Sequence, residues 1–277
     1  MIYSEHIPSL QLTQFVEKIW YCKAHSFASS SITIPFLHHE LVFNFSDSYC
    51  IHKIGTPNDT LKNPRTWING LHTKAYHTFC SGKHEMLGIL FKPDGLKSFL
   101  PFHLQEFTEK TIDASLVFGN VINDVREQIQ NARTVLEKII LLENFLLRNF
   151  SPSKQPPYLS YALEHLSNPG DSRVRITTLC KQLAISNKSL IHCFKKHIGV
   201  SPVTYIQLQL TNKALMRLSK NSAQSLTRLA YSLNFYDQSH FNHLFKSITT
   251  LTPSQYTAFV QTGQLDDSSP NFIQLKG

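Results

Sequence analysis

Short runs of hydrophobic residues, separated by Gly, Pro, Asn and Asp, fill the chain from about residue 31 to residue 92. In one run, Leu41, Phe43 and Phe45 occupy every second position, which is the period of a strand with one buried face. This pattern predicts a small antiparallel β barrel or sandwich in the first half of the chain.

Hydrophobic residues with helical spacing flank the predicted strands. Before them, one helix is predicted from Leu12, Phe15, Val16, Ile19 and Trp20. After them, a second helix is predicted from positions 121, 125 and 129.

A third helix is predicted from Thr134 to Asn149. Thr134 and Glu137 form the capping-box pattern T-x-x-E at its start. Its hydrophobic residues surround most of its circumference, so we expect it to be buried, either on its own sheet or against a second subunit. The sequence does not choose between these two arrangements.

The second half of the chain contains an internal repeat. LAISNKSLIHCFKKHIGVSPVTY, residues 183–205, aligns with LNFYDQSHFNHLFKSITTLTPSQY, residues 233–256, with one residue inserted in the turn of the second copy. Each copy predicts two short helices joined by a tight turn, and the second helix is polar on its free face. This plan is typical of a helix-turn-helix, whose second helix enters a major groove. A helix from about Pro202 to Ser219 joins the two units.

Matched residues begin the helices of both units. Side-chain oxygens that can accept from free backbone N–H groups predict four N-caps: Ser186, Asp237, Ser201 and Thr252. Proline follows Ser201 and Thr252 at the first helical position, where its missing N–H costs nothing. Leu190, Phe194, Phe241 and Phe245 are predicted core residues.

The charge is concentrated in the second half. The chain has 277 residues and a net charge of +8. Residues 156–262 carry 11 Lys and Arg against Glu164, Asp171 and Asp237, whereas the first half is nearly neutral. A compact basic unit of this kind favours a polyanion such as nucleic acid as its partner.

Composition narrows the remaining classes. Hydrophobic residues make up 42% of the chain and charged residues 17%, as in a folded globular protein. The start lacks the pattern of a signal peptide, and no hydrophobic run is long enough for a membrane span, so we expect a cytoplasmic protein without membrane contact. The five cysteines lack C-x-x-C spacing and predict reduced, mostly buried thiols.

We therefore expect an α+β protein with four parts. They are an N-terminal domain at residues 1–150 with a β barrel or sandwich and flanking helices, a linker at 151–157, an all-α domain at 158–262 with two helix-turn-helix units, and a loosely ordered tail at 263–277.

The second unit, SLTRLAYSLNFYDQSHFNHLFKSITTLTPSQY, resembles the signature of the AraC/XylS transcription regulators, and the likeness covers about residues 158–261. The resemblance implies a sequence-specific, double-stranded DNA-binding regulator that reads two successive major-groove segments and catalyses no reaction. It implies base contacts from Lys188, Ile191, His192, Gln238, Ser239, His240, Asn242 and His243. The matched positions of Lys195 and Lys246, with few acidic residues nearby, favour phosphate contacts.

The sequence departs from the family pattern at several positions. His192 and His243 stand where the family usually has Arg, and Gln209 also replaces Arg. A His side chain lacks the bidentate fork that favours guanine, so we expect weaker guanine readout and an affinity that rises as the pH falls toward about 6. Asn234 and Thr250 replace Gly, and Asn tolerates left-handed backbone in the turn.

The first half is similar to the N-terminal regions of some members of this group, through FVEKIW, WING and LGILFKPDG. In that family such a domain often binds a small effector and mediates dimerisation. The resemblance therefore allows three partners besides DNA: a small-molecule effector, RNA polymerase and a second copy of the chain. It names no effector-binding residues and implies no cofactor.

Two alternatives remain open. One is an enzyme or metal-binding β domain with an attached DNA-targeting module, which requires a polar pocket around His72, His77 and His84. Adjacent His38 and His39 point to opposite faces of a strand and cannot share one metal ion. The other alternative is an interaction protein whose helix-turn-helix units have decayed.

Overall fold

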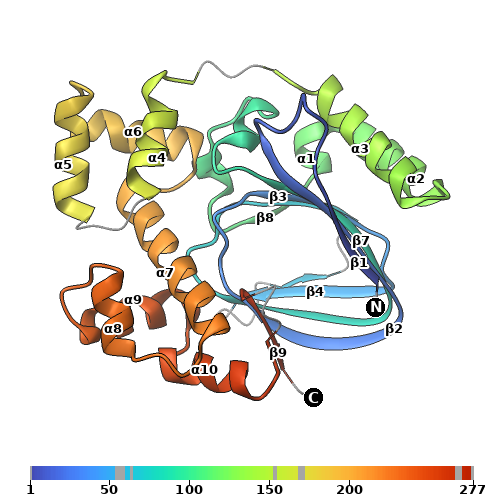
Figure 1. Cartoon of the computed structure of the whole chain (residues 1–277). Helices are drawn as coiled ribbons and strands as arrows, with labels where there is room; N and C mark the ends of the chain where they lie inside the picture. The colour runs from blue at the N-terminus through green and yellow to red at the C-terminus, as the bar shows by residue number, and fades with distance from the viewer. Residues whose placement is uncertain are drawn as a thin grey trace.

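The computed structural model describes residues 2–53, 60–62, 65–151, 155–167, 172–265 and 270–275. In this part of the chain an antiparallel sheet with a few helices occupies the first half, and a helical array occupies most of the second (Figure 1). The expected α+β architecture is confirmed. None of the described helices is long and apolar enough to cross a membrane.

The strands of the sheet come almost entirely from the first 113 residues. Their bounds are β1 Ile2–His6, β2 Val16–Thr33, β3 Glu40–Asn44, β4 Ser48–Lys53, β5 Thr60–Lys62, β6 Thr66–Asn69, β7 Tyr76–Phe91, β8 Thr111–Asp113 and β9 Phe272–Leu275. The main path through the sheet is β1-β2-β7-β3-β6-β8, every pairing is antiparallel, β4 joins β5 to β7, and β9 pairs with β2.

The two long strands, β2 and β7, each extend through two parts of the sheet. The second half of β7 pairs with β3, whereas its first half pairs with β4. Leu41 and Phe43 of β3 face one hydrophobic core, and Val42 faces another with Trp67 and Met86. Alternation along β3 therefore separates two buried faces rather than a buried face and an exposed one.

The helix predicted around residues 12–20 is wrong. Residues 10–15 form turns, and β2 begins at Val16. A register shift between Val16 and Lys18 lets Val16 and Ile19 both face the core, although they are three positions apart. This bulge imitates helical spacing in the sequence.

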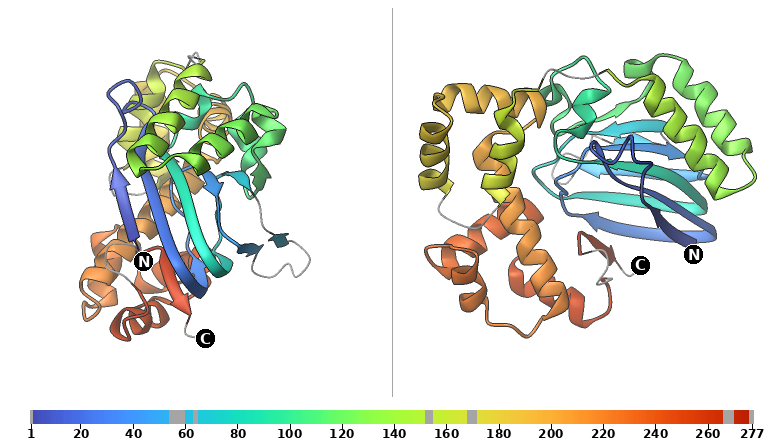
Figure 2. Two further views of the ribbon diagram at one scale, coloured as in Figure 1. Left: turned by 90° about the vertical axis from the view of Figure 1, so that its right-hand side faces the viewer. Right: turned by 45° about the horizontal axis from the view of Figure 1, so that its top comes forward.

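Two helices cover one face of the sheet (Figure 2). Short segments precede them: η1 Gly95–Ser98, η2 Leu104–Phe107 and α1 Ser115–Phe118. The helices α2 Val121–Asn131 and α3 Val135–Arg148 appear where the sequence predicts them, and Thr134 and Glu137 form the expected capping box. Leu142, Phe145 and Leu146 of α3 pack into the sheet core, so α3 is buried on its own sheet, while Leu136 and Ile140 stay exposed.

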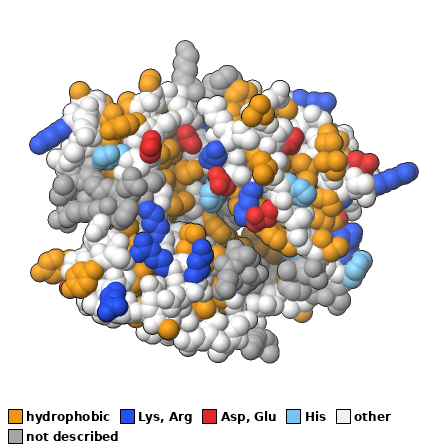
Figure 3. All heavy atoms as spheres, viewed as in Figure 1, with side chains coloured by type: hydrophobic (Ala, Val, Ile, Leu, Met, Phe, Trp, Pro, Cys, Tyr) orange, Lys and Arg blue, Asp and Glu red, His pale blue; other side chains and the backbone are white. Residues whose placement is uncertain are grey.

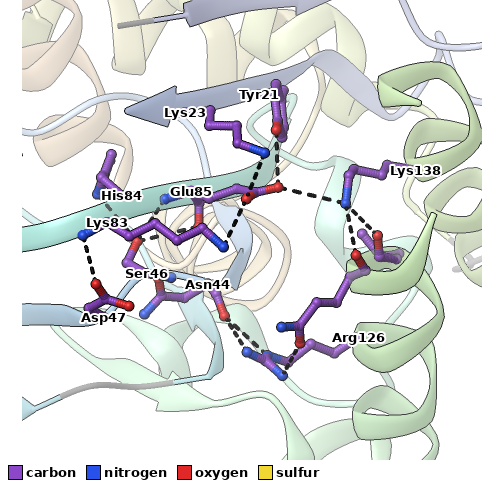
Figure 4. A network of polar contacts seen from close by, with 12 residues as sticks. Tyr21, Lys23, Asn44, Ser46, Asp47, Lys83, His84, Glu85, Arg126 and Lys138 are labelled. Carbon is purple, nitrogen blue, oxygen red and sulfur yellow. Dashed lines mark hydrogen bonds and ion pairs between the residues drawn. The ribbon is translucent and has the colours of Figure 1, made fainter. Parts of the chain in front are cut away.

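A buried carboxylate ties α3 to the sheet (Figure 4). Glu85 of β7 accepts a hydrogen bond from the Tyr21 hydroxyl at 3.0 Å, and Lys23, Lys83 and Lys138 place their ammonium groups 3.3, 3.4 and 3.7 Å from its oxygens. Burial acts to raise the pKa of Glu85, but the hydrogen bonds from Tyr21 and Lys23 outweigh it and hold that pKa below its usual value. The carboxylate therefore remains charged and fully compensated.

The second half contains the helices α4 Tyr158–Ser167, α5 Ser172–Gln182, α6 Asn187–His197, α7 Pro202–Lys220, α8 Leu226–Ser232, α9 Gln238–Thr249 and α10 Pro253–Gln261. Helix α7 is the predicted connection between the two units. Residues of the sheet domain complete both helical cores: Leu37 and Leu71 join the core of the first unit, and Ile32, Ile34 and Ala75 join that of the second.

The expectation of a loosely ordered tail is wrong for residues 270–275. Phe272–Leu275 form β9, which pairs with Ser30–Thr33 of β2 (Figure 2). Ile273 is fully buried in the core of the second unit. Asn271 is buried as well, and its side-chain amide donates to the carbonyls of Ile34 and Pro35 and to the side chain of Asn212. The polar composition of this segment does not predict a strand. Its pairing partner, β2, lies far away in the sequence, so no local pattern indicates the pairing.

Candidate nucleic-acid interface

Side-chain caps begin the second helix of each unit. Ser186 Oγ accepts from the backbone N–H of Ser189 at 3.1 Å, and Asp237 Oδ1 accepts from that of His240 at 2.7 Å. Ser201 and Thr252 cap α7 and α10 in the same way, each with proline at the start of the helix. All four predicted cap residues therefore occupy N-cap positions.

The two units share the same turn. Ala184 and Asn234 both adopt left-handed backbone, with φ of 51° and 59°. The next residue in each unit, Ile185 or Phe235, donates its N–H at 3.0 Å to a carbonyl near the end of the preceding helix. The expectation that Asn234 adopts left-handed backbone is confirmed.

The buried sides of α6 and α9 follow the sequence pattern. Leu190, Phe194, Phe241 and Phe245 are all at most 1% exposed. Packing of these side chains turns the opposite side of each helix away from the core. The prediction that they are core residues is confirmed.

The predicted base-contact residues lie mostly on the free faces. In the two helices the exposed members are Lys188, Ile191, His192, Ser239, His240 and His243. Gln238 is half-buried and accepts a hydrogen bond from Thr227 at 2.6 Å. Asn242 differs from the expectation: it is half-buried, and its Oδ1 is buried without a hydrogen-bond partner in the described structure. Of the two predicted phosphate contacts, Lys246 is exposed and Lys195 is half-buried.

One exposed aromatic residue near the second recognition helix is not identified by the sequence analysis. Tyr236 precedes the cap Asp237 and is 87% exposed. It occupies the turn that holds the extra residue of the second copy, and that insertion is the signal that could have identified it. Its ring is therefore available beside the N-terminal end of α9.

The sheet domain contacts the end of α6. His39 Nε2 donates to the carbonyl of Ile198 at 2.9 Å, and the Thr108 hydroxyl donates to the carbonyl of Gly199 at 2.7 Å. The His103 ring, just before η2, lies 6.3 Å from the ring of His192. The first unit is thus fastened to the sheet domain close to one of its predicted base-contact residues.

The surface over the helical half is basic. In Figure 3, Lys and Arg side chains gather over the region of α7 to α9, while most acidic side chains in view lie over the upper part of the molecule. This distribution agrees with the concentration of positive charge in residues 156–262. Such a surface attracts a polyanion.

The histidines required by the enzyme alternative do not converge. His77 and His84 both lie on β7, seven positions apart, which is roughly 20 Å along an extended strand. His72 lies in the loop after β6 and approaches Glu109. Among the described residues, no group of three or more His, Cys, Asp or Glu side chains is placed to hold a metal ion.

Two family models match the chain. One is a helix-turn-helix domain over residues 179–258, and the other is a domain of unknown function (DUF6597) over residues 4–113. The first match covers both predicted recognition helices, α6 and α9. The second covers most of the sheet.

The curated relatives are bacterial regulators. The arabinose operon regulatory protein of Escherichia coli (strain K12) is 28% identical over 152 residues, which cover 51% of this chain and 50% of that protein. The protein of the same name from Salmonella typhimurium is 28% identical over 154 residues, covering 52% and 53%. The chain thus spans about half the length of the curated relatives it matches.

The similar solved structures are more distant. ToxT from Vibrio cholerae O395 is 13% identical with a TM-score of 0.45, and the match covers 86% of this chain and 99% of that one. The AraC-like transcriptional activator CuxR is 14% identical with a TM-score of 0.26, covering 76% and 86%.

Proposed function

Because the chain belongs to the AraC/XylS family, we propose that it is a sequence-specific regulator of transcription that binds double-stranded DNA through α6 and α9. The observation that carries the proposal is the pair of capped helices with exposed polar faces, joined by α7. Helix α7 has 19 residues, a length of about 28 Å at 1.5 Å per residue. Successive major-groove segments on one face of DNA lie about 34 Å apart, so one connecting helix can present both recognition helices to them.

Base contacts are assigned to the free faces of the two helices. Lys188, Ile191 and His192 would read one segment, and Ser239, His240 and His243 the next, with Gln238 and Asn242 able to join after a side-chain rotation. Lys195 and Lys246 occupy matched positions further along each helix, where an ammonium group can contact phosphate. The proposal places the protein in the cytoplasm with its DNA.

The sheet domain is proposed to bind a small effector and to mediate dimerisation. Leu136, Ile140 and Leu147 of α3 are 65%, 48% and 36% exposed and follow one helical stripe. Beside them, Ser9 donates its N–H to Glu143, and its neighbour Leu10 is 89% exposed. A second copy of α3 is the proposed occupant of this apolar stripe. RNA polymerase is a further proposed partner, reached once the protein is bound at a promoter.

Selection from a random duplex library by the full-length chain tests the central proposal. We expect enrichment of two short submotifs about 10 base pairs apart, with affinity that falls steeply as salt rises. Lys246→Gln is expected to weaken binding evenly across sequences and to reduce the salt slope by about 1. The control Lys110→Gln removes the same charge from an exposed position of the sheet domain and should change neither.

Salt-sensitive binding without an enriched motif would contradict sequence-specific recognition. Absence of any duplex binding would favour the alternative of an interaction protein with decayed helix-turn-helix units. The enzyme alternative is not favoured, because the histidines it requires lie apart.

A further inference from the structure

A small cavity of about 20 Å³ lies in the sheet domain, and all of its lining residues come from the first half of the chain. The loop before β3 supplies Phe36, the start of β3 supplies Glu40, and the end of β6 and the loop behind it supply Asn69 and His72. Tyr76, at the start of β7, also lines the cavity. This volume holds one small polar group rather than a whole metabolite.

Glu40 contributes a carboxylate that has no cationic partner among the described residues. Its two oxygens accept from the indole N–H of Trp20 at 2.9 Å and from the amide of Asn69 at 3.0 Å, and both donors are neutral. Burial raises the pKa of Glu40. In the described part of the chain no Lys or Arg forms an ion pair with it, in contrast to Glu85 with its three lysines.

His72 adds an unused acceptor. It is 6% exposed, and its Nδ1 lies 3.5 Å from a carboxylate oxygen of Glu109. A carboxylate oxygen only accepts, so His72 Nδ1 faces Glu109 as a donor, and in this tautomer Nε2 offers a lone pair. This buried Nε2 has no hydrogen-bond partner in the described structure, although buried polar atoms are nearly always paired.

The lining therefore combines acceptors with aromatic rings. Tyr76 lies with its ring centre 4.8 Å from that of His72, and Phe36 lines the same cavity. Ring faces attract cations, and the acceptors require a ligand that donates N–H or O–H groups. A group that satisfies both needs, and also compensates Glu40, is a small ammonium.

We propose that this cavity binds the ammonium head of a small primary amine, with Glu40 as its counter-ion and His72 Nε2 as the acceptor of one N–H. The rest of the amine would extend from the cavity past Phe36. The site rests on the proposed function in one respect, namely that its ligand serves as the effector of a DNA-binding regulator.

The wall of the cavity is connected to the DNA-binding half. The carbonyl of Pro35 accepts from Asn212 of α7 at 3.1 Å and from Asn271, beside β9, at 3.2 Å. The neighbouring ring of Phe36 lies 5.5 Å from that of Phe272 in β9. An occupant that displaces this loop would act on the helix that connects the two recognition helices.

Titration of the full-length protein with ethylamine, and with neutral ethanol as its matched control, tests the proposal by calorimetry. We expect saturable binding of one ethylammonium per chain, with affinity at least about tenfold above that for ethanol. The tryptophan emission, to which Trp20 contributes as the donor to Glu40, should change along the same curve. Equal binding of ethanol, or no saturable binding of ethylamine, would overturn the proposal.

Two variants and a control sharpen the test. Glu40→Gln keeps the shape of the side chain and should weaken ethylamine binding at least about tenfold without lowering the melting temperature. His72→Phe should weaken ethylamine binding, because it removes the Nε2 acceptor while keeping an aromatic ring at this position. Glu127→Gln, an exposed control on α2, should leave it unchanged. Wild-type affinity in folded Glu40→Gln would refute the site.

DNA binding measured with and without ethylamine separates this inference from the proposed function. Specific DNA binding without any ethylamine binding would overturn the site alone. Ethylamine binding in a protein that selects no DNA sequence would support the site and contradict the proposed function.

Discussion

His243 lies on the exposed face of α9, at the position where the resemblance to the AraC/XylS pattern implies Arg. His243→Arg would restore a bidentate donor pair that matches the acceptors of guanine, which is worth about 1–3 kcal/mol at a cognate base. We predict at least about fivefold tighter binding to sites that have guanine at the base pair contacted by residue 243. Affinity measured on duplexes that differ at one base checks this, and His25→Arg, which adds the same charge on the sheet, is the control. Equal gains on all duplexes would contradict base readout by residue 243.

Two buried histidines make the stability of the protein sensitive to acid. Burial lowers the pKa of His39 to about 4 from its usual 6.5, and burial lowers that of His197 to about 4 as well. The folded protein thus keeps both rings neutral while the unfolded chain protonates them below about 6.5. The free energy of unfolding is therefore unaffected by these two groups above pH 6.5 and decreases as the pH falls toward 4. His39 alone accounts for a decrease of about 3 kcal/mol.

Urea unfolding midpoints between pH 7.5 and about 4.5 test this prediction. His39→Gln keeps a donor for the carbonyl of Ile198 and removes one titrating group, so its midpoint should fall less steeply with acid. The exposed control His25→Gln should follow the wild-type curve. An identical slope in His39→Gln would show that this histidine is not buried neutral at the contact between the two halves.

Among the helices and strands, the features that depend on local sequence patterns were predicted correctly, whereas pairings between distant segments were not. The caps, the turn at Asn234 and the helices α6 and α9 follow from side chains within a few residues of one another. The start of β2 has the hydrophobic spacing of a helix in the sequence because a bulge imitates that spacing. The cavity at Glu40 joins residues from separate strands and loops, and no local spacing signals it.

The strand β9 makes a separate prediction about stability. Ile273 is fully buried between the sheet and the second unit, so Ile273→Ala should cost about 2–4 kcal/mol. Thermal unfolding measures the loss, and Gln274→Ala, an exposed position in the same strand, is the control. A melting temperature equal to that of the control would mean that β9 is not docked in solution.

Across the whole molecule, the two halves share their cores. Leu37 and Leu71 belong to the core of the first helix-turn-helix unit, and Ile32 and Ile34 to that of the second. Sequence periodicity shows which face of a strand is apolar, but not which helix will cover it. The two halves therefore do not have independent cores.

The exposed stripe on α3 predicts self-association. Ile140→Glu would place a charge in the middle of the proposed contact between two copies, and we expect it to shift a dimer to monomer. Sedimentation velocity over a range of concentrations measures the change. Gln128→Glu, exposed on α2, introduces the same charge outside the stripe and should leave the assembly intact. A monomeric wild-type protein would remove dimerisation from the proposal.

The position of β9 in the chain has a consequence for biosynthesis. The ribosome completes β2 long before it makes Phe272–Leu275, so the nascent sheet exposes the backbone groups of Ser30–Thr33 while the helical half is still being translated. Open strand edges recruit other strands, including those of neighbouring nascent chains on the same message. A messenger truncated before codon 272 would therefore yield products in which the β2 edge at Ser30–Thr33 stays unpaired. Their aggregation would depend on how many ribosomes translate each message.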